Sequence, residues 1–161
     1  MPVRKLKDFL DKEKIKYVSI VHSPAFTAQE VAASAHITGK ELAKTVIVRM
    51  DGALAMAVVS ANQHVDFAAL ADATGAEKVE LAGEDEFKEK FPDCEAGAMP
   101  PFGNLYGMKV FADESLLRDK EITFNAGSHR ELIRIAWEDF DRLVQPRLMR
   151  LAITKHVTEA A

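Results

Sequence analysis

The chain contains a single cysteine, and this scarcity excludes several classes of protein. Cys94 has no second cysteine with which to form an internal disulfide bond. One cysteine and five scattered histidines provide no paired spacing of the kind that zinc sites use, so we expect no metal and no other cofactor. Because disulfide-stabilised proteins belong mainly to oxidising compartments, the composition favours a cytoplasmic location.

Long hydrophobic runs are also missing from the sequence. No apolar segment approaches the roughly 20 residues that a membrane-spanning helix needs. The N-terminal residues start an amphipathic pattern at once, without the apolar stretch and cleavage site of a signal peptide. We therefore expect no membrane partner and no secretion signal.

A surplus of basic residues is absent as well. The 21 Lys and Arg residues are outnumbered by 25 Asp and Glu residues, which gives a formal net charge of -4. Proteins that coat nucleic acid usually carry a broad basic face, and no helix resembles a DNA-reading element, so DNA binding is not expected. A pocket for only the end of a nucleic acid stays open, because a few cations can gather in a cleft.

The 161 residues suffice for one domain with a closed core. Hydrophobic periodicity predicts helices and strands in mixed order, without regular βα alternation. This pattern indicates an α+β fold with a mixed, largely antiparallel sheet. We expect the domain to cover residues 1–145, followed by a C-terminal extension, 146–161, that is either a loose helix or a tail. The predicted helices are 3–14, 28–35, 66–73, 84–90 and 137–144, and the strands are 17–21, 44–50, 53–60, 78–81, 108–112, 121–124 and 131–136.

Several local signals fix the ends of these elements. Asp51-Gly52 between two apolar runs predicts a tight hairpin turn. Asp66 and Gly75 are typical caps for the start and end of one helix. Thr27 and Glu30 have the spacing of a capping box, in which each side chain satisfies a backbone amide of the other residue.

One loop, Gly97-Ala-Met-Pro-Pro-Phe-Gly103, carries the strongest functional signal in the sequence. Its glycines allow the backbone to approach a ligand closely, and Pro101 helps to stiffen it, so its amides could grip a small oxygen-rich group. Lys44, at the start of an apolar strand, supplies a fixed positive charge. The alternatives are an ordinary surface loop and a solvated lysine.

A second polar segment, Ser128-His129-Arg130, follows a predicted turn at 125–128 and precedes an apolar strand. His129 could orient a water molecule or act as a general base, because an imidazole exchanges protons near neutral pH. The alternative is a strand-edge histidine bonded to the backbone. Ser60 and Asn62 follow another strand, where polar side chains often enter a site, although Asn62 could equally cap a helix.

Taken in order, several motifs resemble the YbaK/EbsC family, the editing domain associated with prolyl-tRNA synthetases. The resemblance covers about residues 5–145 and is carried by His22-Ser-Pro, Thr27 with Glu30, Ala43-Lys-Thr-Val-Ile-Val48, Gly97 to Gly103, Asp113 with Leu116 or Leu117, and Ala126-Gly-Ser-His-Arg130 leading to Asp139-Phe140. It implies a partly barrel-like mixed sheet surrounded by helices. The Ser-His-Arg turn is a departure, because some members carry a Gly-Gly-Arg-Arg-like turn there.

The resemblance implies a free-standing enzyme that hydrolyses the ester of a mischarged aminoacyl-tRNA, most often tRNA for proline, and a synthetase is a further expected partner. The family's lysine falls on Lys44, and its glycine loop falls on Gly97 to Gly103. The free 2′-hydroxyl of the terminal adenosine is implied as an alternative activating group to His129. The expected catalytic residues are Lys44, Gly97 and His129, and the expected substrate-binding residues are Thr27, Glu30, Ser60, Asn62, Pro101, Gly103, Ser128 and Arg130. The alternative function is a non-catalytic module that binds aminoacyl-tRNA ends, nucleotides or a synthetase.

Overall fold

The computed structural model describes residues 4–21, 42–95 and 97–154 of the chain. Its helices are α1 (Arg4–Lys12), α3 (Phe67–Thr74), α4 (Glu84–Phe87) and α5 (Trp137–Val144), with 3-10 turns η1 (Lys88–Lys90), η2 (Gly103–Leu105) and η3 (Glu114–Arg118). Its strands are β1 (Val18–Val21), β2 (Leu42–Met50), β3 (Ala53–Ser60), β4 (Gln63–Val65), β5 (Val79–Leu81), β6 (Lys109–Asp113), β7 (Glu121–Ser128), β8 (Glu131–Ala136), β9 (Arg147–Met149) and β10 (Ala152–Thr154). The helix expected over 28–35 lies outside the described residues.

Most strands belong to one mixed sheet with the order β1-β8-β7-β2-β3-β6-β9, in which β5 also pairs with β2. The pairs β1–β8, β7–β8, β2–β3 and β2–β5 are antiparallel, whereas β2–β7, β3–β6 and β6–β9 are parallel. A short second sheet pairs β10 with β4. The predicted α+β class with a mixed, largely antiparallel sheet is confirmed.

Local sequence signals explain two of the best-defined boundaries. Asp51 and Gly52 both have positive φ, 49° and 89°, as the tight turn between β2 and β3 requires. Asp66 caps α3 by accepting a hydrogen bond from the Ala69 amide at 3.0 Å, and Gly75 ends that helix in the left-handed conformation. Both predictions are confirmed.

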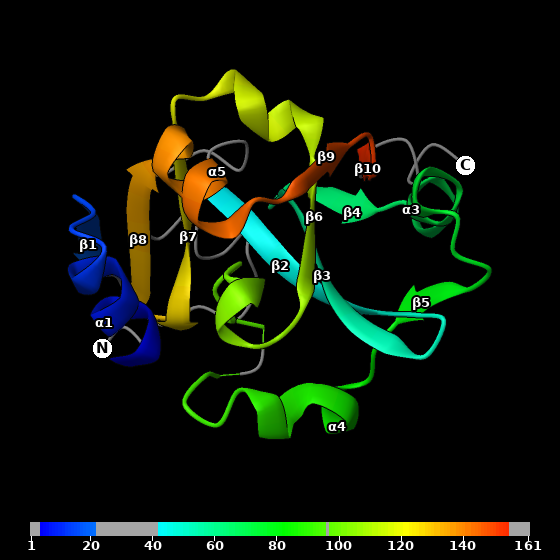
Figure 1. The fold of residues 1–161 in the computed structure, drawn as a ribbon, viewed down its shortest axis with the longest axis horizontal. Coiled ribbons are helices and arrows are strands. Elements are labelled where there is room, and N and C mark those ends of the chain that lie inside the picture. Colours follow the sequence, from blue (N-terminus) through cyan, green and yellow to red (C-terminus); the bar gives the residue numbers. More distant parts are fainter. Residues whose placement is uncertain (1–3, 22–41, 96, 155–161) are drawn as a thin grey trace.

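The main core fills the space between one face of the sheet and the helices α1 and α5 (Figure 1). Phe102 is fully buried, with its ring 5.3 Å from that of Phe124 and 5.5 Å from that of Phe140. A smaller cluster on the other face of β2 and β3 includes Leu70 of α3. None of the described helices is long and apolar enough to cross a membrane.

The chain after residue 145 does not leave the fold as a helix or a tail. β9 pairs with β6, and β10 pairs with β4. The buried carboxylate of Asp113 accepts a hydrogen bond from the Leu151 amide at 2.9 Å, and the Leu151 carbonyl accepts one from Asp66 at 2.7 Å. Both alternatives for this segment are therefore wrong for residues 147–154, which strand pairing with distant parts of the chain holds in place.

Strand β7 is longer than the sequence indicates. The predicted turn at 125–128 is wrong, because these residues continue the strand and the chain reverses at His129 and Arg130. The register with β8 shifts between Asn125 and Ser128, so Ala126 and Gly127 form a bulge. Residues that are typical of turns therefore form a β-bulge within this strand.

Candidate functional site

The site begins where two parallel strands separate. β2 and β7 pair only through Leu42 with Thr123 and Ala43 with Phe124. Beyond these pairs, β2 crosses the view diagonally while β7 continues nearly vertically (Figure 1). Lys44 is the first residue of β2 past the last recorded pair, and Asn125 holds the same position on β7.

Lys44 faces away from the main core. Its neighbour Ala43 and the later residue Ile47 belong to the main core, whereas Val46 and Val48 belong to the cluster on the other face. Because successive side chains of a strand point to opposite faces, Lys44 lies on the face of Val46. Its side chain is half-buried. The structure therefore confirms a lysine near the start of a rigid strand, although its catalytic role stays a prediction.

Gly97 and His129, distant in the sequence, lie close to each other. A Cβ atom placed on Gly97 would lie 3.5 Å from His129 Cε1 and 3.9 Å from Nε2. Gly97 has a φ of +81°, a conformation that other residues adopt only with strain. The backbone conformation thus favours glycine at this position, whereas the space toward the imidazole would admit a Cβ at an ordinary contact distance.

Two backbone hydrogen bonds hold the Gly97 loop against the β7 bulge. The Glu95 amide donates to the Gly127 carbonyl at 2.8 Å, and the Gly127 amide donates to the Ala98 carbonyl at 2.9 Å. His129 is itself 7% exposed and stands at the turn into β8. The position of Gly97 relative to His129 is therefore set by main-chain bonds on both sides of the contact.

The rest of the predicted loop is not an exposed ligand-binding segment. Gly97 is exposed, but residues 98–103 are all buried. A Cβ on Gly103 would lie 2.3 Å from the Met108 carbonyl oxygen, so packing against the start of β6 requires glycine there. Met99 and Phe102 belong to the main core. Only the first residue of the loop is exposed, and the expected binding roles of Pro101 and Gly103 stay predictions.

The remaining candidates are distributed around this centre. Ser128 Oγ accepts a hydrogen bond from the Arg130 amide at 3.0 Å, which stabilises the turn that carries His129, and Arg130 is exposed. Ser60 is buried and pairs with Ala43, so alternation places it on the face opposite to Lys44. The other positions are Asn62 in the turn before β4 and Pro101 within the buried part of the loop, while Thr27 and Glu30 lie outside the described residues.

Sequence reasoning did not single out Asn125. This residue is 5% exposed, and its side-chain oxygen Oδ1 is buried with no hydrogen-bond partner among the described residues. Because Phe124 and Ala126 point into the main core, Asn125 lies on the same face as Lys44. The signal in the sequence was a side-chain amide that follows apolar residues of a strand. Because residues 125–128 were predicted to form a turn, Asn125 was interpreted as a turn residue.

Neither a reactive thiol nor a metal cluster belongs to the described part of the site. Burial raises the pKa of the Cys94 thiol, which opposes formation of a nucleophilic thiolate. Burial also raises the pKa of Tyr106, whose hydroxyl lies 3.9 Å from Cys94 Sγ. Within residues 4–21, 42–95 and 97–154, no group of three or more His, Cys, Asp or Glu side chains could hold a metal ion.

Comparison with known proteins identifies the family. Residues 22–143, most of the chain, match the aminoacyl-tRNA editing domain. The chain belongs to the aminoacyl-tRNA editing domain family. The resemblance predicted from the sequence motifs is thereby confirmed.

Two relatives illustrate the membership of this family. The "Multifunctional Ser/Thr-tRNA deacylase ProXp-y" of Escherichia coli (strain K12) is 34% identical over 100 residues, which are 62% of this chain and 59% of that protein. The "Prolyl-tRNA editing protein ProX" of Acetoanaerobium sticklandii is 25% identical over 142 residues, which are 84% of this chain and 86% of that protein. The chain thus spans less than two thirds of the E. coli relative that it matches.

The fold is shared with solved editing-type structures. A structure provisionally assigned as a trans-editing enzyme for prolyl tRNA synthetase superimposes with a TM-score of 0.79, over 93% of this chain and 96% of its own. The two sequences are 21% identical, so this likeness shows the fold alone. The sheet that carries Lys44 on β2 and Asn125 on β7 therefore belongs to an editing-domain fold.

Proposed function

We propose that this editing-domain protein is a free-standing aminoacyl-tRNA deacylase. It hydrolyses the ester that joins a wrongly attached amino acid to the terminal adenosine of a tRNA. The observation that carries the proposal is the approach of Gly97 to His129, held by main-chain bonds to the bulge of β7, the strand that pairs with β2 directly before Lys44. Family membership adds the expectation that an aminoacyl ester occupies such a site.

Hydrolysis of the ester has three parts that these residues assist. A water molecule attacks the ester carbonyl, negative charge builds up on the carbonyl oxygen, and the ribose oxygen leaves with a proton. Lys44 supplies positive charge for the developing oxyanion or the terminal ribose and phosphate. His129 orients the water and accepts its proton. The Gly97 backbone bounds the space in which the carbonyl lies, because a side chain there would meet His129.

The substrate is a mischarged tRNA, and the relatives indicate which ones to test first. One relative is named for removal of serine and threonine, and another is named for editing of prolyl-tRNA. We propose tRNA for proline as the preferred carrier, with a small amino acid as the cargo and a synthetase as a potential partner. A role in translation places the protein in the cytoplasm.

A deacylation panel tests this function. Purified protein is mixed with tRNA for proline charged with alanine, cysteine, serine, threonine or proline, and loss of the ester is followed with time. We expect hydrolysis of at least one mischarged tRNA, little hydrolysis of the proline ester, and loss of that activity in Lys44→Met. Binding of these tRNAs without turnover would instead support a non-catalytic binding module and overturn the proposal.

A further inference from the structure

Asn125 presents a buried hydrogen-bond acceptor that no group in the described part of the protein uses. Its Oδ1 has no partner within the described structure, and its side chain is 5% exposed. An acceptor held away from water without a donor destabilises a fold, and such groups in native proteins usually have a functional explanation. A donor supplied by a bound ligand is one explanation of this kind.

The position of Asn125 relates this acceptor to Lys44. Both residues directly follow the last β2–β7 pair, and both face away from the main core. Because each residue lies one position past the last pair, the two side chains leave the same face of the sheet at the point where the strands begin to separate. The bulge at Ala126 and Gly127 begins immediately afterwards and is tied to the Gly97 loop by main-chain bonds. Asn125 thus lies one position past the last pair on β7, as Lys44 does on β2, and shortly before His129 along the chain.

The charge of Lys44 selects among the donors that an aminoacyl-ribose end could offer. One donor is the α-ammonium group of the amino acid, and the other is the ribose hydroxyl next to the ester. An ammonium beside the Lys44 ammonium would be repelled, and a buried site penalises the approach of a second positive charge. A hydroxyl is small and neutral, so it can reach the Asn125 oxygen without either penalty.

We propose that Asn125 Oδ1 accepts a hydrogen bond from the ribose hydroxyl adjacent to the ester, which makes Asn125 a substrate-binding residue of the site. The inference rests on the proposed function for the identity of the substrate. Asn125 then fixes the ribose so that the ester carbonyl lies toward Lys44 and His129. It also favours a ribose over a deoxyribose end, because only the ribose has the donor.

Binding of stable analogues tests the inference without any need for hydrolysis. The probes are two adenosine derivatives that carry serine through an amide at the 3′ position, one with the 2′-hydroxyl and one with hydrogen in its place. We expect the wild-type protein to bind the hydroxyl probe about tenfold more tightly, the effect of one buried hydrogen bond. In Asn125→Leu, the ratio of the two affinities should fall to about one.

Stability measurements separate this role from a structural one. Replacing an unpartnered buried amide with an apolar side chain of similar size should leave the melting temperature unchanged or raise it. If Asn125 only supported the fold, Asn125→Leu would lower the melting temperature. Asn125→Asp keeps an acceptor oxygen and should retain part of the preference for the hydroxyl probe.

Thr123→Val is the matched control, since Thr123 lies two residues earlier on the same face of β7. Its hydroxyl already accepts a hydrogen bond from Arg134 Nε at 3.2 Å. This variant should lose some stability and keep the wild-type ratio between the two probes.

The inference is overturned if the wild type binds both probes equally or binds neither. It is also overturned if Asn125→Leu weakens both probes by the same factor. A protein that fails the deacylation panel but distinguishes the probes through Asn125 would refute the proposed hydrolysis and support the inference.

Discussion

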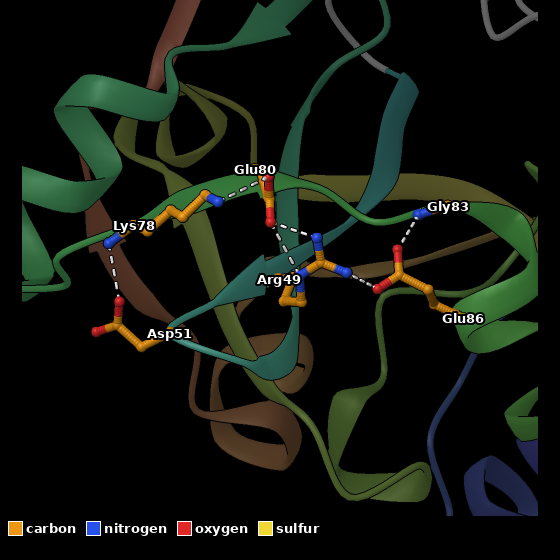
Figure 2. A network of polar contacts seen from close by, with 6 residues as sticks. All are labelled: Arg49, Asp51, Lys78, Glu80, Gly83 and Glu86. Carbon is orange, nitrogen blue, oxygen red and sulfur yellow. Dashed lines mark hydrogen bonds and ion pairs between the residues drawn. The ribbon is translucent and has the colours of Figure 1, made fainter.

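Strand β2 carries a cation toward each end, and the surroundings of the two cations differ. At the hairpin end, Arg49 contacts Glu80 and Glu86 (Figure 2), with Arg49 Nε donating to Glu80 Oε1 at 3.0 Å. Lys78 Nζ lies 3.7 Å from Glu80, and Asp51 accepts hydrogen bonds from the amides of residues 77 and 78. This cluster ties the β2–β3 hairpin to β5 and α4.

At the other end, Lys44 stands where the strand loses its β7 partner. On β7, the residue in the matching position is Asn125, whose side-chain oxygen has no hydrogen-bond partner in the described structure. The bulge of β7 and His129, which Gly97 approaches, follow along that strand and its turn. The groups at this end are mostly buried, whereas the side chains of Arg49, Glu80 and Glu86 are each about one third exposed.

The difference separates an exposed charge network that holds the hairpin from a mostly buried region in which one acceptor, Asn125 Oδ1, has no hydrogen-bond partner in the described structure. Around Arg49, carboxylates and cations satisfy one another, and such exposed networks contribute modestly to stability. Near Lys44, the fold accepts a positive-φ glycine, a bulge and an unsatisfied acceptor within a few residues of one another. Local departures of this kind concentrate at functional sites.

The largest expected effect is the loss of deacylation in Lys44→Met. Methionine keeps much of the length of the side chain but removes the charge that would stabilise an oxyanion, so the rate should fall by roughly 100-fold or more. Single-turnover hydrolysis of the best substrate of the panel measures this. Arg49→Met, the same kind of change at the other end of β2, is the control and should keep the wild-type rate. Equal rates for Lys44→Met and wild type would contradict the proposed role of the lysine.

A smaller loss is expected for Gly97→Ala. The added methyl group would lie 3.5 Å from His129 Cε1, and the φ of +81° is strained for alanine, so the rate should fall by about tenfold. Gly52→Ala is the matched control, because Gly52 has a φ of +89° with no atom within 4 Å of an added Cβ. Both variants should lose similar stability, as measured by thermal unfolding. A rate loss that is the same in both would show that strain alone, and not the contact with His129, explains the effect.

The sequence predicted the parts of the fold that local chemistry determines. These parts depend on residues that are neighbours in the chain. They are the hairpin turn at Asp51-Gly52, the N-cap Asp66 and the C-cap Gly75. The strands β4, β9 and β10 escaped prediction because each has three residues and exists through pairing with a distant strand. Residues 125–128 were predicted to form a turn because their composition is typical of turns. In the structure they continue the strand, and backbone hydrogen bonds join Gly127 to residues 95 and 98.

The site was predictable in its components and not in its geometry. Lys44, Gly97 and His129 were each singled out, but the contact between the last two depends on the β7 bulge. Gly103 seemed equivalent to Gly97, yet its closest neighbour is a backbone carbonyl of the core. Met99, in the same loop, is a core residue, so Met99→Ala would act through stability.

A modest effect on stability is expected for Arg49→Met. The variant leaves Glu80 and Glu86 close together without their shared cation, so the melting temperature should fall by a few degrees at low salt. The difference from wild type should shrink in concentrated sodium chloride, which screens partly exposed charges. A loss of stability that does not depend on salt would show that the packing of the arginine stem matters more than its charge.

The smallest expected effect is the pH dependence that Glu80 contributes. Its hydrogen bond from Arg49, followed by the charge of Arg49, holds the pKa of the Glu80 carboxyl below its ordinary value of 4.5. Its folded pKa is lowered, so the stabilisation is fully present above pH 4.5 and is lost as the pH falls through the folded pKa. Glu80→Gln should therefore be less stable than wild type at neutral pH, and the two melting temperatures should converge as the solution is acidified below that value. The deacylation rate of Glu80→Gln should match wild type at neutral pH, since this carboxylate belongs to the network at the Arg49 end of β2.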